Sequence, residues 1–179
     1  MAITAVIKDD FDLLIAGAAE KWRVPFAWIK AICGAESEYN PLAFRAEPQI
    51  NDGSYGLMQI LLQTARGLGY IGTAAGLLDP ATNIDLASKL LAQLRHSWGT
   101  DFRRVYSAYN SGGPDNYLTN PVVRAHVERA VSYLEAVEAG ITYVYPVEPR
   151  PAPGGAGAAD VGALVYIAIL AAIVFSWKG

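Results

Sequence analysis

Glu36 is a carboxyl group at a helical position where an apolar side chain would be expected. Steps of three, four and seven residues back along a helix reach Cys33, Ile32 and Ile29, so Glu36 shares the apolar face. Burial disfavours the ionised form of a carboxyl group and raises its pKa. A carboxylic acid that keeps its proton near neutral pH can donate it to a leaving oxygen, which is the general-acid step of glycoside cleavage.

Most sites that cleave glycosides use a second carboxylate, and two residues are candidates. Glu38 lies two positions after Glu36, on nearly the opposite side of a helix, so we expect it to be solvated. Asp52 belongs to the turn-forming run Asn51-Asp-Gly-Ser54 and could approach a cleft. Its chemistry favours a turn residue, and a role as a second acid that activates water stays open.

Composition excludes several classes of function. The 179 residues are 53% hydrophobic, which suffices for one domain of ordinary size and a further segment. A net charge of -3, with no Lys/Arg cluster longer than Arg103-Arg104, argues against nucleic-acid binding. Cys33 is the only cysteine, and no Cys/His cluster has metal-ligand spacing. We therefore expect no disulfide, metal or organic cofactor, and Cys33 packed as a small hydrophobe.

The pattern of apolar residues and capping signals predicts a mainly α fold. Residues 42–55 are polar and turn-rich, which indicates a loop or at most a small hairpin. The helices expected from periodicity and caps are a first helix capped by Asp9 or Asp10 and ending before Val24, a second from Pro25 to about Glu38, a stretch starting at 56–60, and further helices at 81–98, 101–109 and from Asn120 onward.

Three short motifs occur in a specific order: Glu36-Ser37 with Asn40-Pro41, Gly56-Leu-Met-Gln-Ile60, and Ala108-Tyr109-Asn110 followed by Gly112. Together they resemble the soluble lytic transglycosylase (SLT) family over residues 25–134. The resemblance implies a lysozyme-like α domain that cleaves peptidoglycan between N-acetylmuramic acid and N-acetylglucosamine. Glu36 would be its one catalytic carboxylate, protonating the glycosidic oxygen and then deprotonating the muramic acid 6-hydroxyl to give a 1,6-anhydro product.

The same resemblance implies the substrate-binding residues. Gln59 would reach the sugar by hydrogen bonds, because an amide among apolar neighbours needs partners. Met58 would contact the sugar, although it could also fill the core. Tyr109 and Asn110 would lie beside the acid, although an Asn before Ser-Gly-Gly is also an ordinary C-cap. Ser37 would support Glu36 or the substrate, or bond locally to the backbone.

One position departs from the family pattern. The family has a Tyr-Val pair on its last helix, with the phenol near the catalytic carboxyl, and this chain has His126-Val127. A protonated His126 would stabilise the Glu36 carboxylate and lower its pKa. Alternatively, Tyr133 or Tyr109 supplies the phenol and His126 is a half-exposed helix residue.

Three segments are expected along the chain: a lysozyme-like domain at 1–143, a Pro/Gly-rich linker at 144–160 and a transmembrane helix at 161–179. Residues 161–177 are uncharged, about the minimum length for a helix that spans a bilayer, and Trp177 and Lys178 resemble interfacial anchors. We therefore expect the domain to be anchored to a lipid membrane.

The location of the protein has two interpretations. Lys8, Asp9 and Asp10 interrupt any apolar signal sequence, although the substrate lies outside the cytoplasmic membrane. A bacteriophage virion with a lipid membrane would resolve this, with the enzyme beside virion proteins and acting on the periplasmic cell wall during genome entry. The alternative is a bacterial cytoplasmic membrane with a periplasmic domain. Two other functions stay open: a goose-type lysozyme that uses Asp52, and a non-catalytic virion or glycan-binding protein.

Overall fold

Proline, glycine and short capping side chains divide the chain into its elements. The computed structural model describes residues 10–140; the predicted linker and membrane segment lie outside that range and stay predictions. The described elements are α1 (Asp12–Trp22), α2 (Phe26–Ser37), β1 (Phe44–Glu47), η1 (Pro48–Ile50), β2 (Asp52–Tyr55), β3 (Ile60–Leu61), α3 (Leu62–Gly67), η2 (Ala74–Leu78), α4 (Pro80–Trp98), α5 (Phe102–Ser111), α6 (Asn116–Thr119) and α7 (Pro121–Glu138). Within residues 10–140, no helix is both long and apolar enough to cross a membrane.

Helix α2 buries the predicted apolar face, whereas the start of α1 differs from the prediction. Ile29, Ile32 and Cys33 are fully buried in α2, so the predicted stripe is confirmed. The predicted carboxylate cap of α1 is wrong, because Phe11 occupies the N-cap without a side-chain hydrogen bond. Asp12, in the first turn, instead forms an ion pair with the buried Lys30.

The polar stretch after α2 forms a small antiparallel sheet. Strand β1 pairs with β2 in the register Phe44 to Tyr55, and β2 pairs with β3 in the register Tyr55 to Ile60. A small hairpin was the upper limit of the prediction, and the structure adds a third strand. The helix predicted to begin at 56–60 is wrong, because positive φ values at Gly56 (71°) and Gln59 (48°) form a turn before β3.

The long helices confirm their predicted bounds closely. Asp79 caps α4 by accepting a hydrogen bond from the Thr82 N–H (2.8 Å), with Pro80 in the first turn. Asn120 caps α7 in the same way through the N–H groups of Val122 and Val123. The predicted inward face of α4 is buried, and this face comprises Ile84, Ala87, Leu90, Leu91 and Leu94.

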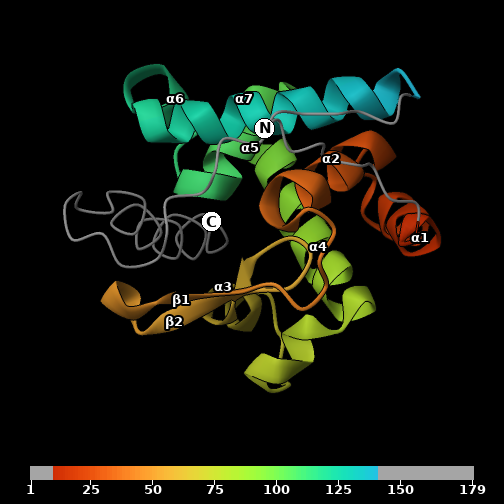
Figure 1. Ribbon diagram of the computed structural model, residues 1–179, viewed down its shortest axis with the longest axis vertical. Coiled ribbons are helices and arrows are strands. Elements are labelled where there is room, and N and C mark those ends of the chain that lie inside the picture. Colours follow the sequence, from red (N-terminus) through yellow and green to blue (C-terminus); the bar gives the residue numbers. More distant parts are fainter. Residues whose placement is uncertain (1–9, 141–179) are drawn as a thin grey trace, which may run out of the picture.

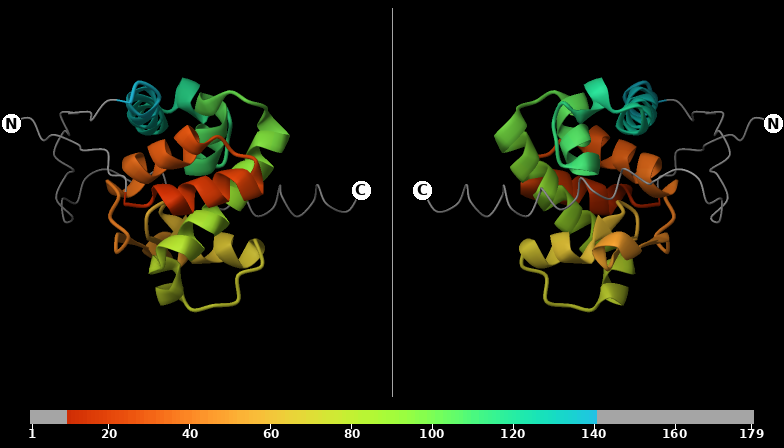
Figure 2. Two further views of the ribbon diagram at one scale, coloured as in Figure 1. Left: turned by 90° about the vertical axis from the view of Figure 1, so that its right-hand side faces the viewer. Right: turned by 90° about the vertical axis from the view of Figure 1, so that its left-hand side faces the viewer.

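The helices and the sheet lie in two parts of the molecule. Figure 1 shows α2, α5, α6 and α7 together in its upper part and the sheet with α3 in its lower part, while α4 links the two. The side views keep this division (Figure 2). Helices α2 and α7 approach closely at Gly34, because a Cβ there would overlap the Tyr133 ring.

Candidate active site

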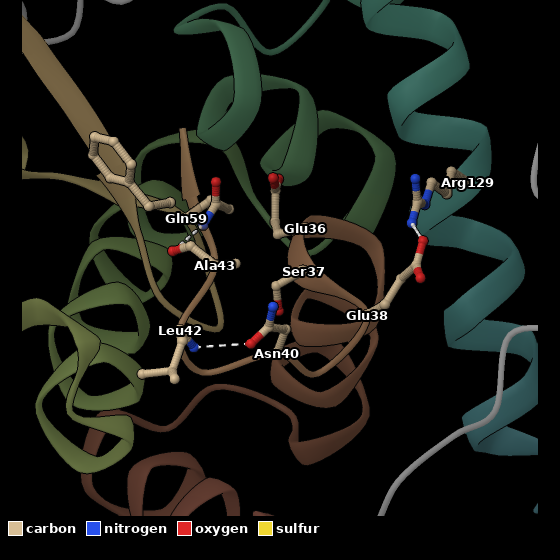
Figure 3. A pocket seen from close by; sticks show the side chains of 9 residues that line it. Glu36, Ser37, Glu38, Asn40, Leu42, Ala43, Gln59 and Arg129 are labelled. Carbon is tan, nitrogen blue, oxygen red and sulfur yellow. Dashed lines mark hydrogen bonds and ion pairs between the residues drawn. The ribbon is translucent and has the colours of Figure 1, made fainter. Parts of the chain in front are cut away.

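A pocket of about 330 Å³ opens where the C-terminal end of α2, the start of the sheet and α7 meet. Figure 3 shows Gln59 on one side of Glu36 and Arg129 on the other. The lining residues are Glu36, Ser37, Glu38, Asn40, Leu42, Ala43, Phe44, Gln59 and Arg129. Residues of the segment 36–44 therefore meet Gln59 of the turn before β3 and Arg129 of α7.

Glu36 lies in the last turn of α2, where the helix leaves the core and enters this pocket. Its side chain is half-buried, and its Oε1 accepts a hydrogen bond of 2.7 Å from the Tyr106 hydroxyl. Tyr106 itself is fully buried in α5. A rigid phenol therefore fixes the orientation of the carboxyl group from the protein side.

Tyr106 provides a phenol next to the Glu36 carboxyl, at a position that was not predicted from the sequence. Tyr109 donates instead to the Met58 carbonyl (2.6 Å), and Tyr133 packs against Gly34. Burial raises the pKa of Tyr133. His126 is half-buried in α7. The phenol bonded to Glu36 is therefore that of Tyr106, which was not among the residues considered from the sequence, and a role for His126 stays a prediction.

A spacing signal for Tyr106 was present in the sequence. Tyr106 precedes Tyr109 by three residues, so both lie on one face of α5. Their rings stack with centroids 6.2 Å apart, and Phe102 stacks on Tyr106 at 5.9 Å. This aromatic row holds the Tyr106 hydroxyl in place.

Ser37 and Gln59 hold the walls of the pocket. The Ser37 hydroxyl donates to the carbonyls of Leu57 (2.8 Å) and Cys33 (3.1 Å), which ties the end of α2 to the turn. The Gln59 amide Nε2 donates to the Gly56 carbonyl (2.9 Å) and the Ala43 carbonyl (3.1 Å). Its carbonyl oxygen points to the same side of the pocket as the Glu36 carboxyl (Figure 3).

Asn83 is a positioning residue that was not predicted from the sequence. Its fully buried side chain donates to the carbonyls of Tyr55 (2.7 Å) and Leu77 (2.8 Å) and accepts from the Met58 N–H (2.8 Å). A Cβ at Gly56 would overlap this amide. The signal was an Asn next to the apolar face of α4, where a polar group needs buried partners.

Met58 and Asn110 lie apart from the lining of the pocket. The Met58 side chain is fully buried in the core, which agrees with the alternative that it fills the core. Asn110 lies half-buried inside α5, and the C-cap is Gly112 with a φ of 79°. The C-cap interpretation of Asn110 is therefore wrong, and its contact with substrate stays a prediction.

Asp52 holds backbone rather than facing the pocket. Its Oδ1 accepts from the N–H groups of Gly53 (2.7 Å) and Leu62 (3.2 Å), and its Oδ2 accepts from the Gln63 N–H (2.9 Å). Leu62 and Gln63 begin α3, whose own N-cap residue, Leu61, provides no side-chain acceptor. Asp52 therefore caps this helix from the neighbouring strand.

Glu38 does not lie on the side opposite Glu36, where the sequence predicted it. The prediction placed it opposite Glu36 by assuming a continuing helix, but α2 ends at Ser37 and Glu38 has a φ of 55°. Its carboxylate lines the same pocket and pairs with Arg129 at 2.9 Å. Figure 3 shows the two glutamates diverging, Glu38 toward Arg129.

Among residues 10–140, no group of three His, Cys, Asp or Glu side chains could hold a metal ion. Cys33 is fully buried in the core, as predicted, and burial raises the pKa of its thiol. The polar side chains that line the pocket carry carboxyl, amide, hydroxyl and guanidinium groups.

The model of the family described as Transglycosylase SLT domain matches residues 13–120. The chain belongs to this family. The match includes Glu36, Gln59 and Tyr106, while α7 with Arg129 lies beyond its end.

Two solved structures have the same mainly helical, lysozyme-like SLT fold. An inactive mutant of lytic transglycosylase Slt from Pseudomonas aeruginosa, with glutamine in place of one glutamate, has a TM-score of 0.64 and 20% identity, covering 75% of this chain and 25% of that chain. The 70 kDa soluble lytic transglycosylase from Escherichia coli has a TM-score of 0.64 and 21% identity, covering 76% and 25%. This chain therefore spans about a quarter of the length of these proteins.

Proposed function

We propose that this chain is a peptidoglycan lytic transglycosylase, a carbohydrate lyase in which Glu36 is the only catalytic acid and base. The observation that carries the proposal is the Glu36 carboxyl, held by the Tyr106 hydroxyl at 2.7 Å inside a pocket of an SLT domain. The proposed bond is the β-1,4 linkage between N-acetylmuramic acid and N-acetylglucosamine.

The proposed reaction needs one carboxyl group in two protonation states. Glu36 first gives its proton to the glycosidic oxygen while the bond from that oxygen to the muramic acid C1 breaks. The muramic acid 6-hydroxyl then bonds to C1 and passes its proton to the Glu36 carboxylate. The acid is thereby restored, and the product is a 1,6-anhydro sugar. An internal hydroxyl replaces water, so this route needs no second carboxylate.

The goose-type lysozyme alternative requires a base that activates water. Asp52 has the right chemistry, but its two oxygens accept three backbone N–H bonds and it does not line the described pocket. Glu38 does line the pocket, but its Oε1 is engaged by Arg129. These contacts favour the single-carboxyl route over the hydrolytic one.

Replacing Glu36 with Gln tests this function directly. The substitution keeps the shape and a hydrogen-bond acceptor for Tyr106 but removes the transferable proton. We expect lysis of purified sacculi to be lost while binding to sacculi is kept. The mutant neighbour from Pseudomonas aeruginosa, inactive with a glutamine at one glutamate, supports this choice.

Glu20→Gln is the matched control, because Glu20 is exposed on α1 and the substitution changes the net charge by the same amount as Glu36→Gln. It should lyse sacculi like the unchanged chain. Unchanged lysis by Glu36→Gln would overturn the assignment. Absence of lysis by the unchanged chain, with binding retained, would favour the non-catalytic glycan-binding alternative.

We also propose that residues 161–177 anchor the domain to a lipid membrane, in a phage virion where it opens the cell wall locally for genome entry, or in a bacterial cytoplasmic membrane. The support is the uncharged run of these residues after the Pro/Gly-rich segment at 144–160. The chain should sediment with liposomes and lose this property when residues 161–179 are removed. Sedimentation that persists without them would contradict the anchor.

A further inference from the structure

The pocket contains one ion pair that the proposed reaction does not use. Arg129 reaches from α7 to Glu38, with its guanidinium nitrogen 2.9 Å from Oε1. Arg129 is the only cationic residue among those that line the pocket in the described part of the chain. An anionic group that enters the pocket therefore meets one cationic side chain, which lies on the side of Glu36 away from Gln59 (Figure 3).

The Arg129 side chain lines the pocket and is partly exposed to solvent. Its guanidinium lies 6.0 Å from the centroid of the Tyr133 ring, which supports the planar group from one side. The side chain is 27% exposed and that of Glu38 is 52% exposed. An ion pair this accessible to solvent adds little to stability. Replacing Glu38 by another carboxylate as the partner of Arg129 therefore requires little free energy.

Glu38 occupies a backbone position that does not favour glutamate. Its φ of 55° lies in the left-handed region, and Tyr39 follows with a φ of 60°. Glycine is the residue that such a helix C-cap prefers. Strained backbone at a site is an observation that points toward function rather than stability. Glu38 thus presents a carboxylate to Arg129 at a cost to the fold.

We propose that Arg129 is a specificity-determining residue that binds a carboxylate on the muramic acid substituent of the substrate, and that Glu38 is the counter-ion which this carboxylate displaces. The inference rests on the proposed function. Guanidinium and carboxylate form two parallel hydrogen bonds, the strongest pairing available to a surface arginine. Peptidoglycan differs from neutral β-1,4 glycans by the carboxylates that its muramic acid carries.

These carboxylates have two sources. A strand with its peptides offers the carboxylates of the peptide, and a strand without them offers the free lactyl carboxylate. Glu38 competes with either source for Arg129. Removal of Arg129 should therefore weaken binding of anionic strands, and removal of the Glu38 charge should strengthen it.

The experiment compares three substrates with the full chain: glycan strands with peptides, strands stripped of peptides by an amidase, and stripped strands whose carboxylates are converted to amides with carbodiimide and ammonia. Arg129→Gln should raise KM about tenfold on strands that bear carboxylates, with kcat nearly unchanged, and should not change KM on the amidated strands. Arg129→Lys should restore part of the loss, because it keeps the charge without the planar fork.

Glu38→Gln should lower KM on the carboxylate strands only. Arg103→Gln is the matched control, because Arg103 pairs with Glu128 and does not line the pocket. An effect of Arg129→Gln confined to intact strands assigns the peptide carboxylates, and one confined to stripped strands assigns the lactyl carboxylate. An effect on both assigns both sources.

Equal KM changes on carboxylate and amidated strands would overturn the inference, as would no change in any Arg129 or Glu38 variant. If Arg129→Gln does not fold, Arg129→Lys and Glu38→Gln carry the same comparison. Failure of the proposed function is distinct, because the unchanged chain would then release no product from any strand. Binding of the Glu36→Gln chain to intact and amidated sacculi, with and without Arg129→Lys, would still test the inference.

Discussion

The Tyr106 hydroxyl of α5 donates a 2.7 Å hydrogen bond to Glu36 Oε1 at the end of α2. This bond connects two residues that are 70 positions apart in the chain. The phenol belongs to a buried row of rings with Phe102 and Tyr109. Packing therefore fixes the donor before any substrate enters. This contact gives the proposed acid a defined orientation in the pocket.

Tyr106→Phe removes this hydrogen bond and keeps the ring. A hydrogen bond to a charged group is worth about 1.5–3 kcal/mol, so kcat should fall about 10- to 100-fold with little change in KM. The carboxylate form of Glu36 loses a donor, so the alkaline limb of the pH–rate profile should move to higher pH. Tyr70→Phe, which removes an exposed hydroxyl bonded to the Thr73 carbonyl, is the control. A fall in kcat with an unmoved pH profile would leave Tyr106 with a packing role only.

Asn83→Ala should be among the most destabilising substitutions near the site. Two hydrogen bonds hold residues 55–58 to Asn83 in α4 and a third holds the Leu77 carbonyl, so the substitution removes the Asn83 donor from the carbonyls of Tyr55 and Leu77. We expect the free energy of unfolding to fall by about 2–4 kcal/mol, measured by urea denaturation. Gly56→Ala should destabilise as well, because its φ of 71° and the overlap with Asn83 both oppose a Cβ. A loss below about 0.5 kcal/mol for Asn83→Ala would show that the turn holds without it.

Asp52→Asn separates a structural role from a catalytic one. The amide cannot accept from the Gln63 N–H as Oδ2 does, so unfolding should be easier by about 1 kcal/mol. Product identity should not change, because Asp52 caps α3 rather than activating water. Reducing-end products that disappear with this substitution would instead support the goose-type alternative.

The Asp79 cap should give part of the stability a pH dependence. Hydrogen bonds from Thr82 lower the pKa of Asp79 below its ordinary value of 3.8. A lowered pKa means that the contribution is complete above 3.8 and is lost as pH falls through the value in the folded protein. Asp79→Ala should destabilise the fold by about 1 kcal/mol at neutral pH and by progressively less as the pH falls below 3.8.

Asp79→Asn keeps an acceptor without a titrating charge, so its stability relative to Asp79→Ala should vary little over the same range. Thermal unfolding at several pH values measures both differences. A constant gap between the original chain and Asp79→Ala across this range would contradict the prediction.

Helices that depend on local signals could be predicted from the sequence. Asp79-Pro80 and Asn120-Pro121 cap and open α4 and α7, and the apolar spacing of α4 matches its buried face. Local signals did not predict the positions where the backbone has a positive φ. The φ of Gln59 is 48° and that of Glu38 is 55°, and neither glutamine nor glutamate is a residue type that favours a left-handed backbone.

Site residues could be predicted where each belonged to a short sequence motif. Glu36 and Gln59 line one pocket, and Ser37 joins them. Tyr106 and Arg129 were missed because their roles depend on contacts across 70 and 91 residues of chain. Periodicity places them on helix faces, but only the packing of α5 and α7 against α2 brings them to the carboxylates.

The mass of the muropeptides that the unchanged chain releases from purified sacculi tests the central claim most directly. Attack by the muramic acid 6-hydroxyl predicts 1,6-anhydro products, each lighter by one water than the corresponding hydrolysis product, and none of these with Glu36→Gln. Predominantly reducing-end products from the unchanged chain would contradict the single-carboxyl mechanism.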